Sequence, residues 1–155
     1  MPTVKSTTVD VHIFCRTASQ PLYLLLHRSP DKRYAGLWRM VAGKIEPDET
    51  AVRAAIRELY EETGLRAINL FALDYTHSFY DPQDDCVYLI PVFSAEVASM
   101  DVALSDEHDD SRWITYDQAL GLLRWPGQRE GLRHTHEDVV TPPDRGNAFR
   151  VTAHG

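Results

Sequence analysis

The strongest constraint on the fold is the stretch 43–65, which reads GKIEPDETAVRAAIRELYEETGL. Thr50 is a favourable N-cap residue and Gly64 is a favourable residue just past a helix end, and most residues between them are good helix formers. The sequence therefore predicts a helix that ends near Thr63. Its apolar residues recur with helical spacing, which predicts that one face of the helix packs against a core. This face is formed by Ala51, Val52, Ala55, Ile56 and Leu59.

A second face of the same helix carries three carboxylates. Glu58, Glu61 and Glu62 are spaced i, i+3 and i+4, so their side chains lie close together. Surface helices usually relieve such repulsion with interleaved lysines, and this helix has none. A divalent cation would relieve it, and oxygen ligands suit Mg²⁺ or Mn²⁺. The competing interpretation is an acidic face that is only solvated.

The spacing of the whole stretch matches the Nudix box, G-x5-E-x7-R-E-U-x-E-E-x-G-U with U aliphatic, and every defined position is filled. The chain is therefore identified as resembling the Nudix hydrolase family of MutT-like enzymes. The resemblance implies an α/β/α sandwich around a mixed β-sheet. It also implies hydrolysis of a nucleoside diphosphate linked to another group, with Mg²⁺ or Mn²⁺ as cofactor and with water attacking phosphorus.

The rest of the chain agrees with a mixed α/β fold. Strands precede and follow one central helix, and a closing helix comes last, which indicates a mixed sheet between helices. We expect one domain over 1–155, with a core from about 8 to 140, a frayed segment at 1–7 and a loose tail at 141–155. The expected strands cover about 9–14, 22–26, 38–41, 67–79, 87–97 and 111–115, and the later helices cover about 116–123 and 128–140.

Composition limits the class of partner. A formal charge of −7 argues against stable nucleic-acid binding, which would need a basic face, but a bound metal can reverse the local sign for a small phosphorylated substrate. Cys15 and Cys86 have no metal or redox spacing, and residues 1–20 lack an apolar signal region. We therefore expect a cytoplasmic protein with a small-molecule nucleotide substrate and no membrane contact, and leave open whether it forms a homodimer.

The resemblance also assigns roles within the box. Glu58, Glu61 and Glu62 would bind the metal, and one carboxylate would accept a proton from the attacking water. Glu58 is one candidate for this base, and the assignment stays open. Arg57 would orient a box carboxylate, with Glu49 as its ion-pair partner or as an outer ligand. Gly43 permits a close backbone approach, and its carbonyl is a further candidate metal ligand.

Another candidate ligand lies outside the box, in Asp106-Glu107-His108. An acidic residue in the loop before this late strand often completes a Nudix metal site, so Glu107 is the candidate and Asp106 its substitute. A solvated acidic loop is the competing interpretation.

Five residues are candidates for contacting the substrate. Arg28 could hold a phosphate, Lys44 and Glu46 flank Gly43, and two aromatic side chains could stack on a base: Tyr80 and Trp125. We expect Trp113 to pack in the core. The histidines at 77, 134 and 136 lack zinc-like companions and are expected at the surface.

The substrate within the family is less constrained. The run from Trp38 to Thr50, together with Glu107-His108 and Trp113, resembles the branch that includes bacterial dihydroneopterin triphosphate pyrophosphatase, also described as a dATP pyrophosphohydrolase. This resemblance implies cleavage of a nucleoside or pterin triphosphate to a monophosphate and pyrophosphate. Coenzyme A, ADP-ribose and dinucleoside polyphosphates remain alternatives. A domain that binds a nucleotide as a sensor without turnover is an alternative of another class.

Overall fold

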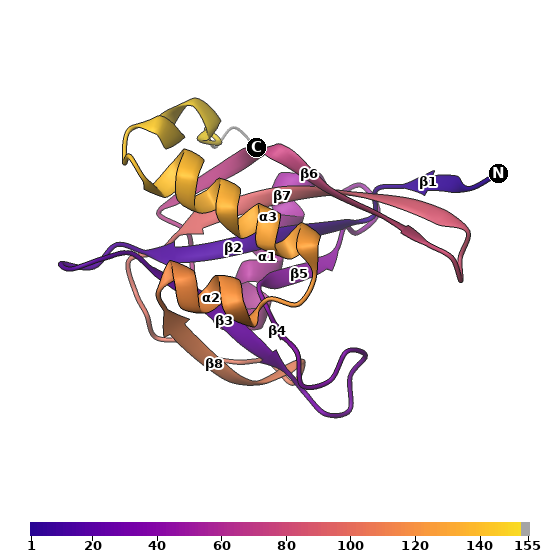
Figure 1. The fold of residues 1–155 in the computed structure, drawn as a ribbon, viewed down its shortest axis with the longest axis horizontal. Helices are drawn as coiled ribbons and strands as arrows, with labels where there is room; N and C mark the ends of the chain where they lie inside the picture. The colour runs from indigo at the N-terminus through magenta and orange to yellow at the C-terminus, as the bar shows by residue number, and fades with distance from the viewer. Residues whose placement is uncertain (153–155) are drawn as a thin grey trace.

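The computed structural model describes residues 1–152 and consists of an eight-stranded mixed sheet with helices on both faces (Figure 1). The strands are β1 Thr3–Lys5, β2 Thr8–Cys15, β3 Leu22–Arg28, β4 Trp38–Arg39, β5 Val41–Lys44, β6 Asn69–Asp81, β7 Cys86–Glu96 and β8 His108–Ile114. The α-helices are α1 Ala51–Thr63, α2 Tyr116–Leu122 and α3 Pro126–His134, followed by the π-helix η1 Thr135–Val140 and the 3₁₀-helix η2 Arg145–Phe149.

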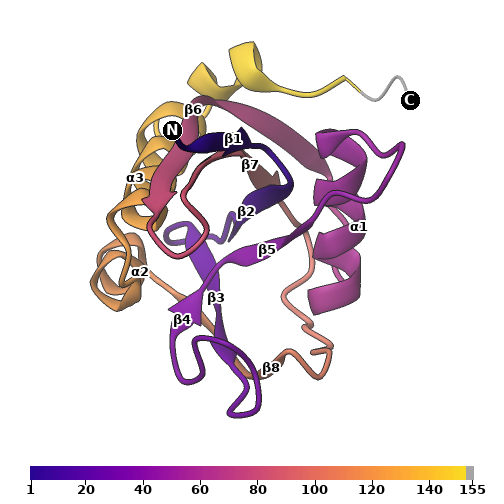
Figure 2. The ribbon, with the colours of Figure 1, turned by 90° about the vertical axis from the view of Figure 1, so that its right-hand side faces the viewer.

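Helix α1 covers one side of the sheet, and α2 and α3 cover the other (Figure 2). This is the α/β/α arrangement that the sequence predicts. Strand β2 lies at the centre, parallel to β7 and antiparallel to β3 and β5. Strand β8 pairs antiparallel with β3, which brings the late strand to the same region as the box. No helix in residues 1–152 is long and apolar enough to cross a membrane.

The expectation of a frayed segment at 1–7 is wrong. Residues Thr3–Lys5 form β1, which pairs in parallel with the start of β7. All three side chains are exposed, so the backbone ladder rather than side-chain burial holds this strand in place. A polar sequence gives little sign of such a strand, because its pairing partner is far along the chain.

Helix α1 has the predicted caps. The Thr50 hydroxyl accepts a hydrogen bond from the Arg53 amide, and Gly64 adopts the left-handed conformation with φ of 70°. The predicted apolar face is rotated, however. Ile56 is 49% exposed, whereas Glu62 is buried beside Ala55 and Leu59. The buried face of this helix therefore includes one acidic residue.

The long hairpin of β6 and β7 contains an irregularity. The pairing register shifts between Ala72 and Thr76, opposite the Pro91 region. Pro91 itself pairs with Thr76, and β7 lies inside the sheet between β6 and the pair β1 and β2. The proline therefore marks a bulge and not a sheet edge.

The segment after η1 is not the loose tail that we expected, as far as the structure describes it. Arg150 forms a bridge with Phe71, and the Val151 amide donates to the Leu70 carbonyl at 2.7 Å. Gly146 is buried, close to the backbone of Val139. Residues 153–155 of the predicted tail lie outside the described residues.

The loop between β7 and β8 is tied to the end of α1. The Ala103 amide donates a 2.8 Å hydrogen bond to the carbonyl of Thr63, the last residue of the helix. Trp113 packs against the core on the α1 side, as predicted, and its indole N–H donates to the Met100 carbonyl at 3.0 Å. These contacts fix the loop that precedes β8 relative to the box helix.

Candidate metal site

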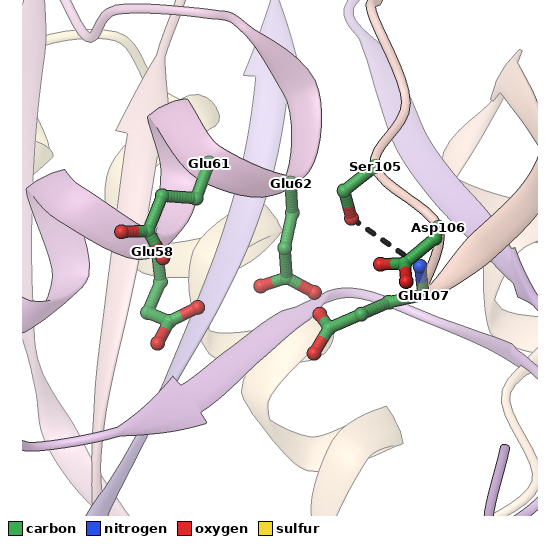
Figure 3. A pocket seen from close by; sticks show the side chains of 6 residues that line it. All are labelled: Glu58, Glu61, Glu62, Ser105, Asp106 and Glu107. Atoms are coloured by element: carbon green, nitrogen blue, oxygen red, sulfur yellow. Dashed lines mark hydrogen bonds between the residues drawn. The ribbon is translucent and has the colours of Figure 1, made fainter.

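An acidic pocket of about 240 Å³ lies between α1 and the loop before β8 (Figure 3). It is lined by the three box carboxylates and by a short loop segment: Glu58, Glu61, Glu62, Ser105, Asp106 and Glu107. The end of β3 holds this loop segment, because Ser29 donates from its hydroxyl to the Asp106 carbonyl and from its amide to the Glu107 carbonyl. The structure thus brings Glu107 to the box carboxylates, as the sequence predicts.

Glu62 is the deepest carboxylate of the pocket. Its residue is 2% exposed, and neither carboxylate oxygen has a hydrogen-bond partner. Burial, followed by the nearby charge of Glu107, raises the pKa of Glu62 to about 9. A buried carboxylate without donors is strongly disfavoured unless a positive charge faces it.

His108 is the neighbour of Glu62 on β8. Its Nδ1 lies 3.6 Å from Glu62 Oε1, and neither ring nitrogen has a hydrogen-bond partner. Burial, with the nearby charge of Arg39 next in weight, lowers the pKa of His108 to about 4, so the imidazole is neutral. Ligand atoms of Glu62, Glu107 and His108 all lie within 4.8 Å of one another. No role for His108 was predicted from the sequence, although it directly follows Glu107.

These observations test whether a divalent cation fits the pocket. The lining offers several carboxylates, and the deepest has two buried oxygens without partners. Oxygen-rich donor sets suit Mg²⁺ and Mn²⁺. The residues present therefore fit a hard divalent cation.

Arg57 forms a network at the outer side of the pocket. Its guanidinium donates to Glu49 Oε1 at 2.8 Å and to Glu49 Oε2 at 2.9 Å, and also to Glu58 at 2.9 Å and Glu61 at 3.2 Å. A fourth partner is the Lys44 carbonyl at 2.8 Å. The hydrogen bonds from Arg57 lower the pKa of Glu49 to about 2. Arg57 thus contacts three box carboxylates, and one of them is Glu49, the ion-pair partner that the resemblance implies.

Gly43 allows the Glu58 carboxyl group to lie against the β5 backbone. A Cβ atom built at Gly43 would lie 2.0 Å from the Glu58 Cδ and 2.3 Å from its Oε1. The pKa of Glu58 is raised above its usual value, and burial is the largest cause. The predicted close approach is therefore to a side chain of the box helix.

Three further predicted site residues lie beside residues of the pocket without lining it. Lys44 and Glu46 flank Arg57: Lys44 accepts from it through its carbonyl, and Glu46 Oε1 lies 3.9 Å from its guanidinium. Arg28 donates from Nε to the Arg33 carbonyl at 3.2 Å, and its Nη1 lies 3.9 Å from Glu107 Oε2.

The two aromatic candidates lie on other segments. Tyr80 is at the tip of the β6–β7 hairpin, where its hydroxyl donates to Asp85. Trp125 precedes α3 and meets Tyr34 of the β3–β4 loop edge to face, with ring centroids 6.2 Å apart. Both rings are exposed, and neither contributes to the acidic pocket.

One of the three histidines expected at the surface is buried. The Nδ1 of His77 lies 2.8 Å from Asp10 Oδ2. His134 and His136 are both half-buried, and His136 shares a hydrogen bond with the buried Tyr23. A histidine without zinc-like companions can thus be a buried residue that pairs with a buried carboxylate.

Comparison with known proteins decides the family. The family model described as NUDIX domain matches residues 6–135. This chain belongs to the Nudix hydrolase family. The family comprises enzymes that act on phosphorus-containing anhydrides, and the matched range contains both halves of the acidic pocket.

Several known proteins and solved structures are similar to this chain. The chain is 34% identical over 129 residues to an octanoyltransferase of Myxococcus xanthus, covering 81% of this chain and 35% of that protein. It is 27% identical over 146 residues to the asymmetrical bis(5′-nucleosyl)-tetraphosphatase of Rattus norvegicus. This alignment covers 92% of this chain and 89% of that protein. A Listeria monocytogenes structure described as a NUDIX hydrolase superposes with a TM-score of 0.73 at 26% identity, covering 96% of this chain and all of that one. The Nudix chain thus spans about a third of the length of the first relative and most of the second.

Proposed function

We propose that this Nudix protein is a Mg²⁺- or Mn²⁺-dependent pyrophosphohydrolase that cleaves a nucleoside or pterin triphosphate to a monophosphate and pyrophosphate. The observation that carries the proposal is the acidic pocket, in which Glu58, Glu61 and Glu62 meet Glu107 from a distant segment. A domain that only binds a nucleotide has no need for this many carboxylates around one small space. The pocket therefore supports turnover over the sensor alternative.

The proposed roles follow from where each side chain lies. Glu58, Glu61, Glu62 and Glu107 would hold the cation, with His108 packed behind Glu62. The Gly43 carbonyl remains a proposed additional ligand. When bound, Mg²⁺ or Mn²⁺ neutralises negative charge on the phosphate oxygens and on the leaving group.

The protein's own groups position the carboxylates and move the proton. Arg57 holds Glu58 and Glu61 in place through hydrogen bonds of 2.9 and 3.2 Å, so these groups need little reorganisation during the reaction. The proton of the attacking water passes to a pocket carboxylate, and Glu58 and Glu107 are the two candidates. The buried position of Glu58 raises its pKa toward that of a useful base.

The choice of a triphosphate rests on the resemblance of the Trp38–Thr50 run and of Glu107-His108 to that branch of the family. Selectivity would come from outside the pocket, where Trp125 and Tyr34 form an exposed aromatic pair close to the loop after Arg28. Tyr80, Lys44 and Glu46 remain proposed substrate contacts.

The second candidate substrate is a dinucleoside polyphosphate. The alignment with the rat tetraphosphatase covers most of both chains and favours it. The same metal chemistry serves both substrates, and only the group beyond the phosphates differs.

Product analysis tests the proposal. The purified protein is incubated with Mg²⁺ and a panel of nucleoside triphosphates, dihydroneopterin triphosphate, diadenosine tetraphosphate, coenzyme A and ADP-ribose. We expect monophosphate and pyrophosphate from a triphosphate, and no turnover in excess chelator. Release of inorganic phosphate would contradict the predicted bond, and preference for another panel member would move the protein to that substrate class. Turnover unaffected by chelator would contradict the metal site.

A further inference from the structure

Arg39 lies on the same face of the sheet as the acidic pocket. It pairs with Leu26 across β4 and β3, and cross-strand partners point to the same face. Leu26 belongs to the core beneath α1. The neighbouring residue Trp38 points the other way and packs against His27, with ring centroids 4.9 Å apart. Arg39 therefore projects toward the box helix.

The carboxylates of the pocket influence this guanidinium. Burial lowers the pKa of Arg39, and the largest opposing influence is the charge of Glu62, followed by the charges of Asp10 and Glu107, while the charge of Arg28 adds to the lowering. On β3 the next residue of the same face, Arg28, pairs with His108, whose Nδ1 lies 3.6 Å from Glu62. Arg39 thus shares this face of the sheet with Arg28, next to the segment that carries the pocket.

Arg39 differs from the other two arginines of the site in its partners. Arg57 is bound to three carboxylates and a carbonyl, and Arg28 to the Arg33 carbonyl with Glu107 at 3.9 Å. Among the residues that the structure describes, no side-chain hydrogen bond or ion pair includes Arg39. Its Nε is buried without a partner, which normally costs stability. An arginine kept in this state beside an anion-processing site has donors available for a ligand.

We propose that Arg39 binds a phosphate oxygen of the substrate, on the inner side of the acidic pocket. The planar guanidinium matches phosphate geometry and cannot lose its charge at working pH. A bound cation would take the carboxylates as ligands, which would leave the donors of Arg39 for the phosphate chain. This inference rests on the proposed function and assigns to Arg39 the phosphate contact that sequence analysis assigned to Arg28.

A counter-charge role is the alternative that the experiment must separate. If Arg39 only offsets the charge of Glu62 and Glu107, its removal should raise the affinity for Mn²⁺ and leave nucleotide affinity unchanged. If it binds phosphate, its removal should weaken nucleotide binding measured at saturating Mn²⁺.

The test measures binding of a non-hydrolysable α,β-methylene nucleoside triphosphate to the full chain by calorimetry, with Mn²⁺ saturating. Arg39→Gln should weaken binding roughly 10- to 100-fold, the usual effect of losing a hydrogen bond to a charged group. Arg39→Lys should recover part of the loss, because it keeps the charge without the planar fork. Arg112→Gln is the matched control, since Arg112 packs over Trp38 on the opposite face and should bind as the wild type does.

The outcomes are distinguishable. Wild-type protein that neither binds nor hydrolyses any member of the substrate panel refutes the proposed function itself. If the wild-type protein binds the nucleotide, and the affinities of Arg39→Gln and Arg39→Lys are both within twofold of the wild-type value, the role of Arg39 is refuted. If Arg39→Gln does not fold, the lysine variant decides: an affinity equal to that of the wild type refutes the inference, and a weaker one with unchanged Mn²⁺ affinity supports it.

Discussion

Replacing Gly43 with alanine should inactivate the enzyme without unfolding it. The new Cβ would lie 2.0 Å from the Glu58 Cδ, so the carboxyl group must retreat by about 1.4 Å to reach ordinary contact distance. That movement would disrupt the 2.9 Å hydrogen bond between Glu58 and Arg57. Displacing a reacting group by about 1 Å costs roughly 10²-fold in rate, so we expect kcat to fall by about that factor.

The stability of this variant should change by less than about 1 kcal/mol. The atoms that must move belong to the end of a flexible side chain, and Gly43 does not have a positive φ that alanine would strain. Replacing glycine by alanine also reduces the entropy of the unfolded chain, which favours folding slightly.

Steady-state kinetics and thermal unfolding check the prediction together, with Gly121→Ala as the control. Gly121 lies within α2, and an added Cβ there meets no atom within 4 Å. We expect the control to keep full activity and to gain up to about 1 kcal/mol of stability. Unchanged kcat in Gly43→Ala would show that the position of the Glu58 carboxylate does not matter. A large fall in unfolding temperature would show a structural effect instead.

Glu61→Gln and Glu62→Gln should each lower kcat by at least about 10²-fold, whereas Arg53→Gln on the same helix should have little effect; equal losses at all three positions would indicate structural damage. Because the pKa of Glu62 is raised to about 9, the metal-free protein holds a proton there at neutral pH and must release it to bind a cation. The Mn²⁺ dissociation constant measured by calorimetry should therefore fall about tenfold per pH unit from about pH 6.5 to 8, and a flat profile would contradict this. Gly131→Ala should lower the free energy of unfolding, measured in urea, by about 1–2 kcal/mol and leave kcat unchanged. The reason is that the new Cβ would lie 2.5 Å from His12 Nε2, on the sheet face opposite α1. Unchanged stability would show that this contact relaxes freely.

Local signals in the sequence predicted the box helix correctly. Its caps at Thr50 and Gly64 depend only on neighbouring residues, and so does the clustering of Glu58, Glu61 and Glu62. The rotation of the buried face could not be read in the same way. A hydrophobic pattern counts Ile56 as buried and Glu62 as exposed, and the reverse holds because the pocket lies beside the core.

Features that depend on strand pairing were harder to predict. Glu107 was found through its family pattern, but Arg39 and His108 were not, because they reach the pocket only through the register of β3 with β4 and β8. The position of Tyr80 at the tip of the hairpin, outside the pocket lining, also depends on strand pairing, so its proposed contact with the substrate stays a prediction.

The hydrogen bond from Ala103 to the end of α1 has a consequence for how this protein can diversify. Both partners are backbone groups, so this bond itself does not depend on the side chain of Ala103. Val102 and Leu104 pack against the core, so they must stay apolar, whereas the exposed residues 99–101 of the loop can drift in sequence while Glu107 keeps its position. We expect tolerance to substitution at 99–101, and sensitivity to insertion or deletion between Ala103 and Glu107.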